Sequence, residues 1–406
     1  MKLQHGFHLT YCSNIHPGES WDEVRDNLSR YLPELRRLMR TDVPMGIGLR
    51  LSAQAADALA MPHTLDAFKQ FLQEANAYVF TINGFPYGVF HGARVKEDVY
   101  LPDWKDDERL RYTRACARIL AALLPDEPGL EGSISTVPGA FKGEVNGPED
   151  VRRMASHMVR QVADLHRLRT ETGKHLTLAI EPEPCCYIET IAEAITFFRE
   201  ELCSSESLTE LASACKLSMD GALQAVREHI GLCYDACHMA IEFEDAGKAL
   251  AALEEAGIRV CKFQISSALK LTFQRGDGRP RQVLAPFSES TYLHQVVERS
   301  AAGLVRYKDL PEAMDRVEDP AAGRRGEPVE WRVHFHVPIF LEEMRNFQTT
   351  QDHLIDLFEH LKRRPTCPYL EVETYTWDVL PAEYKTTGVT EAIARELNWV
   401  RERIES

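Results

Sequence analysis

The sequence predicts an α/β protein of the (β/α)8 TIM barrel class. Short apolar segments with β-like composition alternate along the chain with helix-forming stretches. In the second half, four of these segments end in side chains that can bind a metal ion: Glu181, Asp235, Gln264 and Glu373. The C-terminal strand ends of such a barrel converge on one mouth, so these side chains would become neighbours. The alternative is a doubly wound open sheet, but the chain has no Gly-x-Gly-x-x-Gly turn and no P-loop.

Length and composition agree with one large soluble domain. The chain has 406 residues, of which 44% are hydrophobic and 27% charged, and by length alone a single barrel with insertions fits as well as two domains. Its net charge of −15 argues against general binding to a phosphate backbone, which depends on Lys and Arg. We therefore expect a small-molecule partner and no nucleic acid, and a homodimer is compatible with the sequence.

Cysteine usage and hydropathy indicate the compartment. The 10 cysteines include no Cys-x-x-Cys pair and no zinc-ribbon spacing, so we expect buried thiols in a reducing environment. The N-terminus lacks the apolar core of a signal peptide, and no run approaches the roughly 20 apolar residues of a membrane span. These features predict a cytoplasmic protein with no membrane span.

The first half of the chain contains four predicted βα units. Strands are expected at 6–15, 44–51, 77–83 and 130–137, with helices near 20–35, 64–74, 107–124 and 148–170. Ser20 and Glu23 have the spacing of a capping box at the start of the first helix. Behind them, Val24, Leu28 and Leu35 recur at helical spacing.

The second half supplies the remaining strands and an insertion. Strands are expected at 178–182, 232–238, 260–266 and 369–374, with helices that start near Thr190, span 243–256 and close the chain at 390–404. A ninth strand-like run at 331–340 exceeds the eight of a barrel. We therefore expect a single domain over 1–406 with an insertion at 270–340 on the catalytic face, where βα loops lie.

The two glutamate positions each have a competitor. Pro182 cannot donate to a sheet ladder, so it marks a strand end and places Glu181 at the mouth. Glu183 shares that face by strand alternation and remains an alternative. Glu373 is preferred to Glu371, which has the same facing, because Glu373 lies nearer the C-terminal end of its strand.

Asp235 and Gln264 complete the predicted metal site. Asp235 lies in a strongly apolar segment, where a carboxylate needs a compensating charge. Gln264 ends the next strand and can offer an amide oxygen. Together with Glu181 and Glu373 they form an oxygen set that suits one divalent cation such as Mg²⁺ or Mn²⁺, and Zn²⁺ stays open.

Several other polar residues are candidates for substrate contact. They lie near strand ends, in the following loops or in the insertion: His238, His16, Arg50, Asn83, His91 and His336. His334 and His336 alternate onto one face of the inserted run, so either could reach over the mouth.

The chain resembles two protein groups. The series Glu181, Asp235-x-x-His238, Gln264 and Glu373 resembles the metal site of the xylose isomerase-like barrel superfamily, with the strand-seven Gln of its hydroxypyruvate isomerase-like members. The resemblance implies that Glu181 and Glu373 also act as an acid/base pair. Segments 9–21 and 83–104 resemble the EboE family of bacterial metabolite traffic proteins, and this similarity extends over nearly the whole chain.

Two hypotheses of function follow. The first is a sugar isomerase or epimerase in which glutamates move a proton of a small polyhydroxylated carbonyl metabolite through a metal-bound enediolate. The second is a metabolite-binding or traffic protein that keeps the metal site without turnover. A barrel endonuclease is disfavoured, because it needs a histidine-rich zinc site and a basic face, whereas this chain is acidic and its predicted ligands are carboxylates and an amide.

Overall fold

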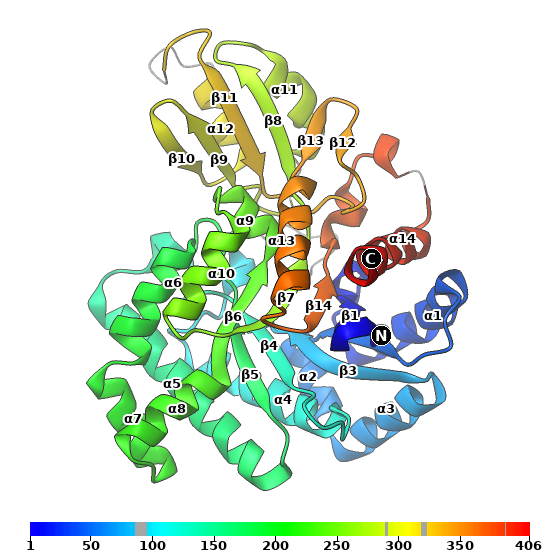
Figure 1. Ribbon diagram of the computed structural model, residues 1–406, viewed down its shortest axis with the longest axis vertical. Helices are drawn as coiled ribbons and strands as arrows, with labels where there is room; N and C mark the ends of the chain where they lie inside the picture. Colours follow the sequence, from blue (N-terminus) through cyan, green and yellow to red (C-terminus); the bar gives the residue numbers. More distant parts are fainter. Residues whose placement is uncertain (86–95, 289–290, 318–322, 386) are drawn as a thin grey trace.

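Eight parallel strands form a nearly closed barrel in the computed structural model, which describes residues 1–85, 96–288, 291–317, 323–385 and 387–406 (Figure 1). The barrel strands are β1 (His8–Tyr11), β2 (Met45–Arg50), β3 (Ala77–Asn83), β4 (Gly132–Thr136), β5 (Leu176–Ile180), β6 (Ile230–Asp235), β7 (Val260–Ile265) and β14 (Tyr369–Val372). They are ordered β1-β14-β7-β6-β5-β4-β3-β2. A parallel bridge between Cys12 and Gly48 joins the two outer strands. The predicted barrel is therefore confirmed.

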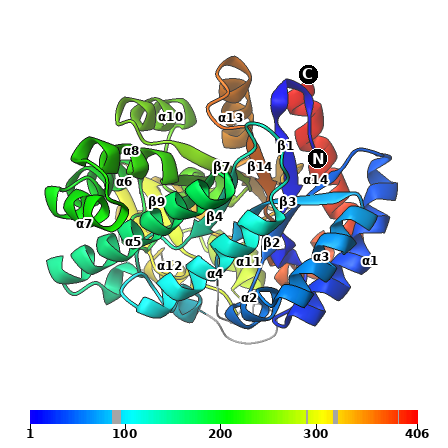
Figure 2. The same ribbon diagram turned by 90° about the horizontal axis from the view of Figure 1, so that it is seen from below.

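Helices surround the barrel, as the view from below shows (Figure 2). They are α1 (Trp21–Met39), α2 (Ala53–Leu59), α3 (Pro62–Glu74), α4 (Asp107–Leu123), α5 (Pro148–Thr172), α6 (Ile191–Phe197), α7 (Ser205–Cys215), α8 (Met219–His229), α9 (Ala236–Ile241), α10 (Ala246–Glu255), α13 (Gln351–Arg363) and α14 (Val389–Glu405). Capping boxes begin α1, with Ser20 and Glu23, and α6, with Thr190 and Glu193, as the sequence predicts. Among the described helices, none is long and apolar enough to cross a membrane.

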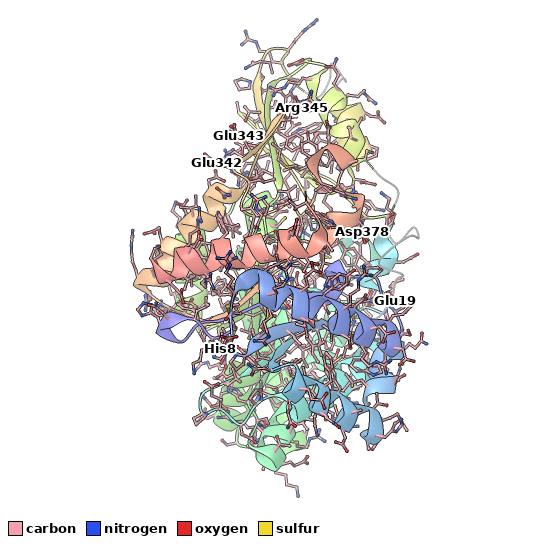
Figure 3. All side chains as sticks on the ribbon, turned by 90° about the vertical axis from the view of Figure 1, so that its right-hand side faces the viewer. His8, Glu19, Glu342, Glu343, Arg345 and Asp378 are labelled. Carbon is pink, nitrogen blue, oxygen red and sulfur yellow. The ribbon has the colours of Figure 1, made fainter. Side chains whose placement is uncertain are left out.

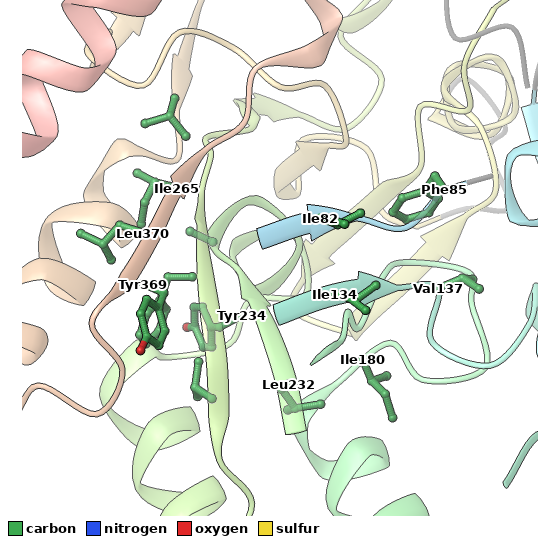
Figure 4. Packing of buried hydrophobic residues seen from close by; sticks show 14 of the residues in the cluster. Ile82, Phe85, Ile134, Val137, Ile180, Leu232, Tyr234, Ile265, Tyr369 and Leu370 are labelled. Carbon is green, nitrogen blue, oxygen red and sulfur yellow. The ribbon is translucent and has the colours of Figure 1, made fainter. Parts of the chain in front are cut away.

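Side chains along the barrel strands point alternately toward apolar packing and toward a polar barrel interior. Ile82, Ile134, Ile180 and Leu232 of four successive strands belong to one buried apolar cluster (Figure 4). Inside the barrel, the Ser133 hydroxyl donates to Thr81 over 2.9 Å. The strand period of two residues therefore also decides which side chains can reach the barrel axis.

A buried ion pair fills part of the barrel interior. Lys262 of β7 and Glu371 of β14 are both fully buried and bonded to each other. The Glu371 carboxylate reaches β2, where a Cβ on Gly48 would lie 1.8 Å from Glu371 Oε1. Glycine is required at position 48 because this carboxylate occupies the space of a side chain.

The chain leaves the barrel after β7 and builds a second, antiparallel sheet. This excursion contains β8 (Leu269–Gln274), α11 (Arg279–Leu284), β9 (Val296–Ser300), β10 (Gly303–Tyr307), α12 (Leu310–Val317), β11 (Pro328–Val333), β12 (Glu343–Met344) and β13 (Phe347–Thr349). The sheet order is β10-β9-β11-β8-β13-β12, and it stands at one end of the barrel (Figure 1). In the side view, Glu342, Glu343 and Arg345 of the excursion lie above Glu19 of the barrel (Figure 3).

The excursion returns across the strand ends that form the barrel mouth. The expected strand at 331–340 is shorter than predicted, because β11 ends at Val333. The next segment contacts the strand ends instead: the Val337 amide donates to the Ser267 carbonyl over 2.9 Å, and His336 Nδ1 lies 2.8 Å from the Glu373 carbonyl oxygen. Residues 334–338 therefore lie over the end of the barrel at which the candidate metal ligands gather.

Candidate metal centre

Three carboxylates from distant parts of the sequence meet at the barrel mouth. Glu181 follows β5, Asp235 ends β6 and Glu373 follows β14, and one oxygen from each lies within 4.8 Å of the others. All three residues are buried. Strand-end position therefore brings together the carboxylates that the sequence singles out, as parallel barrel strands require.

Hydrogen bonds fix Glu373 but leave part of the cluster without partners. Glu373 Oε1 accepts from Asn14 Nδ2 over 2.8 Å and from Asn83 Nδ2 over 2.9 Å. Among the described residues, Glu181 Oε2 and Asp235 Oδ2 have no hydrogen-bond partner. A buried carboxylate oxygen without a partner is costly, and a cation would satisfy it. The donor set therefore fits a divalent metal ion.

Asp235 is held by its own local structure. Asp235 Oδ1 accepts from the Ser266 hydroxyl over 2.7 Å and from the His238 amide over 3.0 Å, so it also caps the short helix α9. Because Oδ1 is engaged in this way, Oδ2 is the atom left to face the cluster. His238 lies in the first turn of α9, and its side chain lines the pocket at the mouth.

Burial and like charge alter the acidity of the cluster. Burial, together with the charges of Glu373 and Asp235, raises the pKa of Glu181 well above its usual value. Burial and the charges of Asp235 and Glu371 raise the pKa of Glu373 to about 8. Burial opposes ionisation of Asp235, but His238, His336 and the Ser266 hydrogen bond hold its pKa below the usual value. Without a cation, the three carboxylates are not all ionised at neutral pH.

Gln264 lies beside the cluster with its amide nitrogen toward Glu373. Gln264 Nε2 donates to Glu373 Oε2, and the Cys233 thiol donates to Gln264 Oε1. The sequence predicts the amide oxygen as a metal ligand, and in this arrangement the amide would have to turn over to present it.

The structure separates both pairs of competing glutamates. Glu371 is in the barrel interior, bonded to Lys262, whereas Glu373 joins the cluster at the mouth. Glu183 accepts from the Tyr100 hydroxyl over 2.7 Å and lies beside His238 and His334, so it borders a neighbouring group of potential ligands.

A group of histidines lies next to the carboxylates. His334 Nε2 is 3.1 Å from His238 Nε2 and 3.3 Å from His336 Nε2. His238 and His336 also form a group with Asp235 within 4.8 Å. All three imidazoles are buried, and burial lowers the pKa of His336 to about 4. The mouth therefore offers imidazole groups beside the carboxylates, and the position of His334 and His336 agrees with their alternation onto one face of the inserted run.

A pocket opens onto both groups. Glu181, Glu373, Asn83, His238 and His334 line it, and it contains about 540 Å³ of atom-free space, its opening to solvent included. A pocket of this volume suits a small ligand.

The remaining residues predicted to contact substrate differ in their position relative to this pocket. His16 and Arg50 do not line this pocket: His16 stacks on Tyr31 with ring centroids 4.0 Å apart, and Arg50 pairs with Glu19 over 2.7 Å. His336 does not line this pocket either, but it contacts His334, which does. His91 lies outside the described residues.

Sequence reasoning overlooked several residues of the site. Asn14 follows β1 and holds Glu373, so the strand-end rule that selects Asn83 would also have found it. Gln295 and Tyr375 line the pocket from the excursion and from the segment after β14. Gln295 carries no local signal, because only the fold of the excursion brings it to the barrel.

Comparisons with known proteins agree on the fold. No family model matches the chain, and no curated protein matches its sequence. Among solved structures, it is similar to a xylose isomerase-like TIM barrel protein from Mycobacterium smegmatis in complex with magnesium, at 10% identity, TM-score 0.50 and coverage of 100% and 98% of the two chains. A xylose isomerase domain protein from Alicyclobacillus acidocaldarius has 13% identity, TM-score 0.43 and 98% coverage of both chains. An IOLI protein with a binding zinc atom has 11% identity, TM-score 0.47 and 98% coverage of both. The chain therefore has a xylose isomerase-like TIM barrel fold.

Proposed function

We propose that this protein is a metal-dependent isomerase or epimerase that acts on a small polyhydroxylated carbonyl metabolite. The buried carboxylates of Glu181, Asp235 and Glu373 carry the proposal, since two of their oxygens accept no hydrogen bond from the described residues. These three residues would hold one divalent ion, Mg²⁺, Mn²⁺ or Zn²⁺, and Gln264 would join them once its amide turns over. A bound divalent ion polarises carbonyl and hydroxyl oxygens of a ligand.

The two glutamates are suited to exchange a proton with the metabolite. Glu181 and Glu373 extend from β5 and β14, which β6 and β7 separate in the barrel, and both line the pocket. One would start as the carboxylate and take the proton from the carbon beside the carbonyl group. The other would start protonated and donate its own proton to the neighbouring carbon or to the opposite face of the same carbon. In the metal-free protein, burial and the neighbouring carboxylates raise the pKa of both groups. Asn14 and Asn83 hold the Glu373 carboxylate in place for this role.

The lining of the buried pocket limits which ligands can enter it. Phe85, Tyr100 and Tyr375 line the pocket beside the polar groups, so the ligand meets an apolar wall on one side. The size of the pocket and this mixed lining support a small metabolite. The resemblance of segment 9–21 to the EboE family supports metabolite handling as well, including transport of a ligand without turnover.

Deuterium exchange from solvent tests the proposal. The Mn²⁺-loaded protein would be incubated in D₂O with a panel of small aldoses and ketoses, and label at carbons next to the carbonyl group would be measured by NMR. We expect wild-type exchange with at least one sugar. In Glu181→Gln and Glu373→Gln the rate should fall about 10²–10⁴-fold, the usual contribution of a general acid or base.

Glu396→Gln is the matched control, because Glu396 is also buried but bonds to Thr374 and to the Ile339 amide. It should exchange label at the wild-type rate. Absence of exchange with every sugar, in protein shown to hold metal, contradicts an isomerase. A ligand that copurifies and is released unchanged would then identify a metabolite carrier.

A further inference from the structure

A second cavity lies away from the barrel mouth, between the excursion and the C-terminal helix. It is a groove with about 780 Å³ of atom-free space, its opening to solvent included, a volume typical of small-molecule sites. Its lining comes from residues 338–345, from the segment after β14 and from α14, above which the β12–β13 hairpin stands in Figure 1. Among the described residues, none lines both this groove and the mouth pocket, so the two cavities are separate.

Arg395 of α14 brings a guanidinium group to the groove. Its guanidinium carbon lies 3.9 Å from the centroid of the Phe340 ring. Glu391 precedes it by four residues on the same helix, a spacing that allows a surface ion pair. Within the described part of the chain, however, Arg395 makes no ion pair and no hydrogen bond. The ring therefore holds the side chain in place while its N–H donors stay available.

Trp377 lines the same groove with a second available donor. It lies in the 3-10 turn Tyr375–Val379 after β14, and its exposed fraction is only 7%. Its indole N–H has no acceptor among the residues that the structure describes, although an indole buried to this extent usually finds one. An acceptor bound in the groove would satisfy this N–H group.

The rest of the lining is apolar or carries compensated charge. Met344 and the Tyr384 ring add apolar surface. Arg345 and Glu383 pair with each other over 3.0 Å, and Glu343 is exposed to solvent. The groove thus combines an apolar wall with two hydrogen-bond donors, one of which is cationic.

We propose that this groove binds a small organic carboxylate with a flat apolar body. The carboxylate would accept hydrogen bonds from Arg395, whose planar guanidinium matches its geometry. The apolar body would lie against Trp377 and Met344 and remove their surface from water. This site does not depend on the function proposed for the mouth, because its residues lie outside that pocket.

Ligand-observed NMR tests the site with phenylacetate, with its uncharged counterpart phenylacetamide, and with acetate, which lacks the apolar body. Full-length protein would be treated with chelator, so that no acid can bind through a metal ion at the mouth. We expect the wild type to bind phenylacetate about tenfold or more tightly than phenylacetamide, because hydrogen bonds to a charged group are the stronger ones. Acetate should bind more weakly by a similar factor, since it buries no ring.

Three variants identify the residues that hold the acid. Arg395→Gln should weaken phenylacetate binding about tenfold or more, and Trp377→Phe, which keeps a ring but removes the N–H, by a smaller factor. Arg403→Gln is the matched control, because Arg403 lies on the same helix with its guanidinium carbon 3.7 Å from the Trp399 ring centroid, outside the groove. It should bind phenylacetate as the wild type does.

Three results would overturn the proposal: no binding of phenylacetate, equal binding of phenylacetamide, or unchanged binding in Arg395→Gln. An equal loss in Arg403→Gln would overturn it too, since any positive charge on the helix would then suffice. None of these results bears on the carboxylate cluster, which the chelator leaves without metal in every sample.

Discussion

Two neighbouring layers of buried charge on the same two strands are organised in opposite ways. In the barrel interior, Lys262 of β7 compensates Glu371 of β14. Two residues further along each strand, Gln264 and Glu373 lie at the mouth, where three carboxylates meet and Gln264 brings no charge. The side chains of both layers are buried, so burial alone does not distinguish them. The imbalance of charge marks the layer that needs a ligand from outside.

Glu396 shows a third arrangement of a buried carboxylate. It accepts hydrogen bonds from the Thr374 hydroxyl over 2.7 Å and from the Ile339 amide over 3.2 Å. Burial outweighs these bonds and raises the pKa of Glu396 to about 7. Buried carboxylates of this protein thus occur in three surroundings: beside a cation, beside uncharged hydrogen-bond donors, and in a cluster of like charge.

The largest effect should come from breaking the balanced layer. Lys262→Met leaves Glu371 buried with no cation, which typically costs about 3–5 kcal/mol. Urea unfolding of the chelator-treated protein should show a loss of this size. The double variant Lys262→Met, Glu371→Gln removes the stranded charge and should recover most of the stability. A loss below about 1 kcal/mol in the single variant would mean that the pair does not hold the interior together.

A smaller effect on stability should come from the titration of Glu396. The pKa of this carboxyl is about 7 in the fold against 4.5 as the ordinary value. Its contribution to stability is therefore complete below about pH 4.5, is lost as the pH rises, and is gone above about pH 7. The loss is at most about 3 kcal/mol. Unfolding free energies of wild type and Glu396→Gln should thus diverge in favour of the variant between pH 4 and pH 8, and parallel curves would contradict this account.

The smallest effect should be a gain in stability at the mouth. In metal-free protein, Glu181→Gln removes a carboxyl whose ionisation is opposed in the fold by burial and by Glu373 and Asp235, so the free energy of unfolding at pH 8 should rise by about 1 kcal/mol. Urea titration in the presence of chelator measures it. The sign is the opposite of that expected for Lys262→Met, and a destabilised Glu181→Gln would remove the distinction between the two layers.

The sequence predicts the barrel and much of the carboxylate group for a physical reason. Parallel strands bury both faces, so their segments are continuously apolar and their polar ends are easy to recognise. Glu181, Asp235 and Glu373 stand at such ends, and the barrel geometry brings them together. The choice between Glu371 and Glu373 could be made from their position along the strand alone.

The remaining parts of the site depend on contacts that local sequence does not encode. Gln295 and His334 reach the mouth only because the excursion folds into its own sheet and returns across the strand ends. His16 and Arg50 satisfied the same strand-end rule, yet Tyr31 and Glu19 engage them outside the pocket. A strand-end position indicates where a side chain starts, whereas its partners decide where it points.

Titration with Mn²⁺ tests the central claim most directly, because the free ion is observed by electron paramagnetic resonance. Wild-type protein should remove Mn²⁺ from solution at a tight site. Glu181→Gln should weaken this binding on the order of a hundredfold or more, since loss of a ligand exceeds the 10–100-fold cost of losing a ligand's hydrogen-bond partner. Glu396→Gln should bind as the wild type does. Equal Mn²⁺ binding by all three proteins, or none by the wild type, would contradict a metal site at the carboxylates.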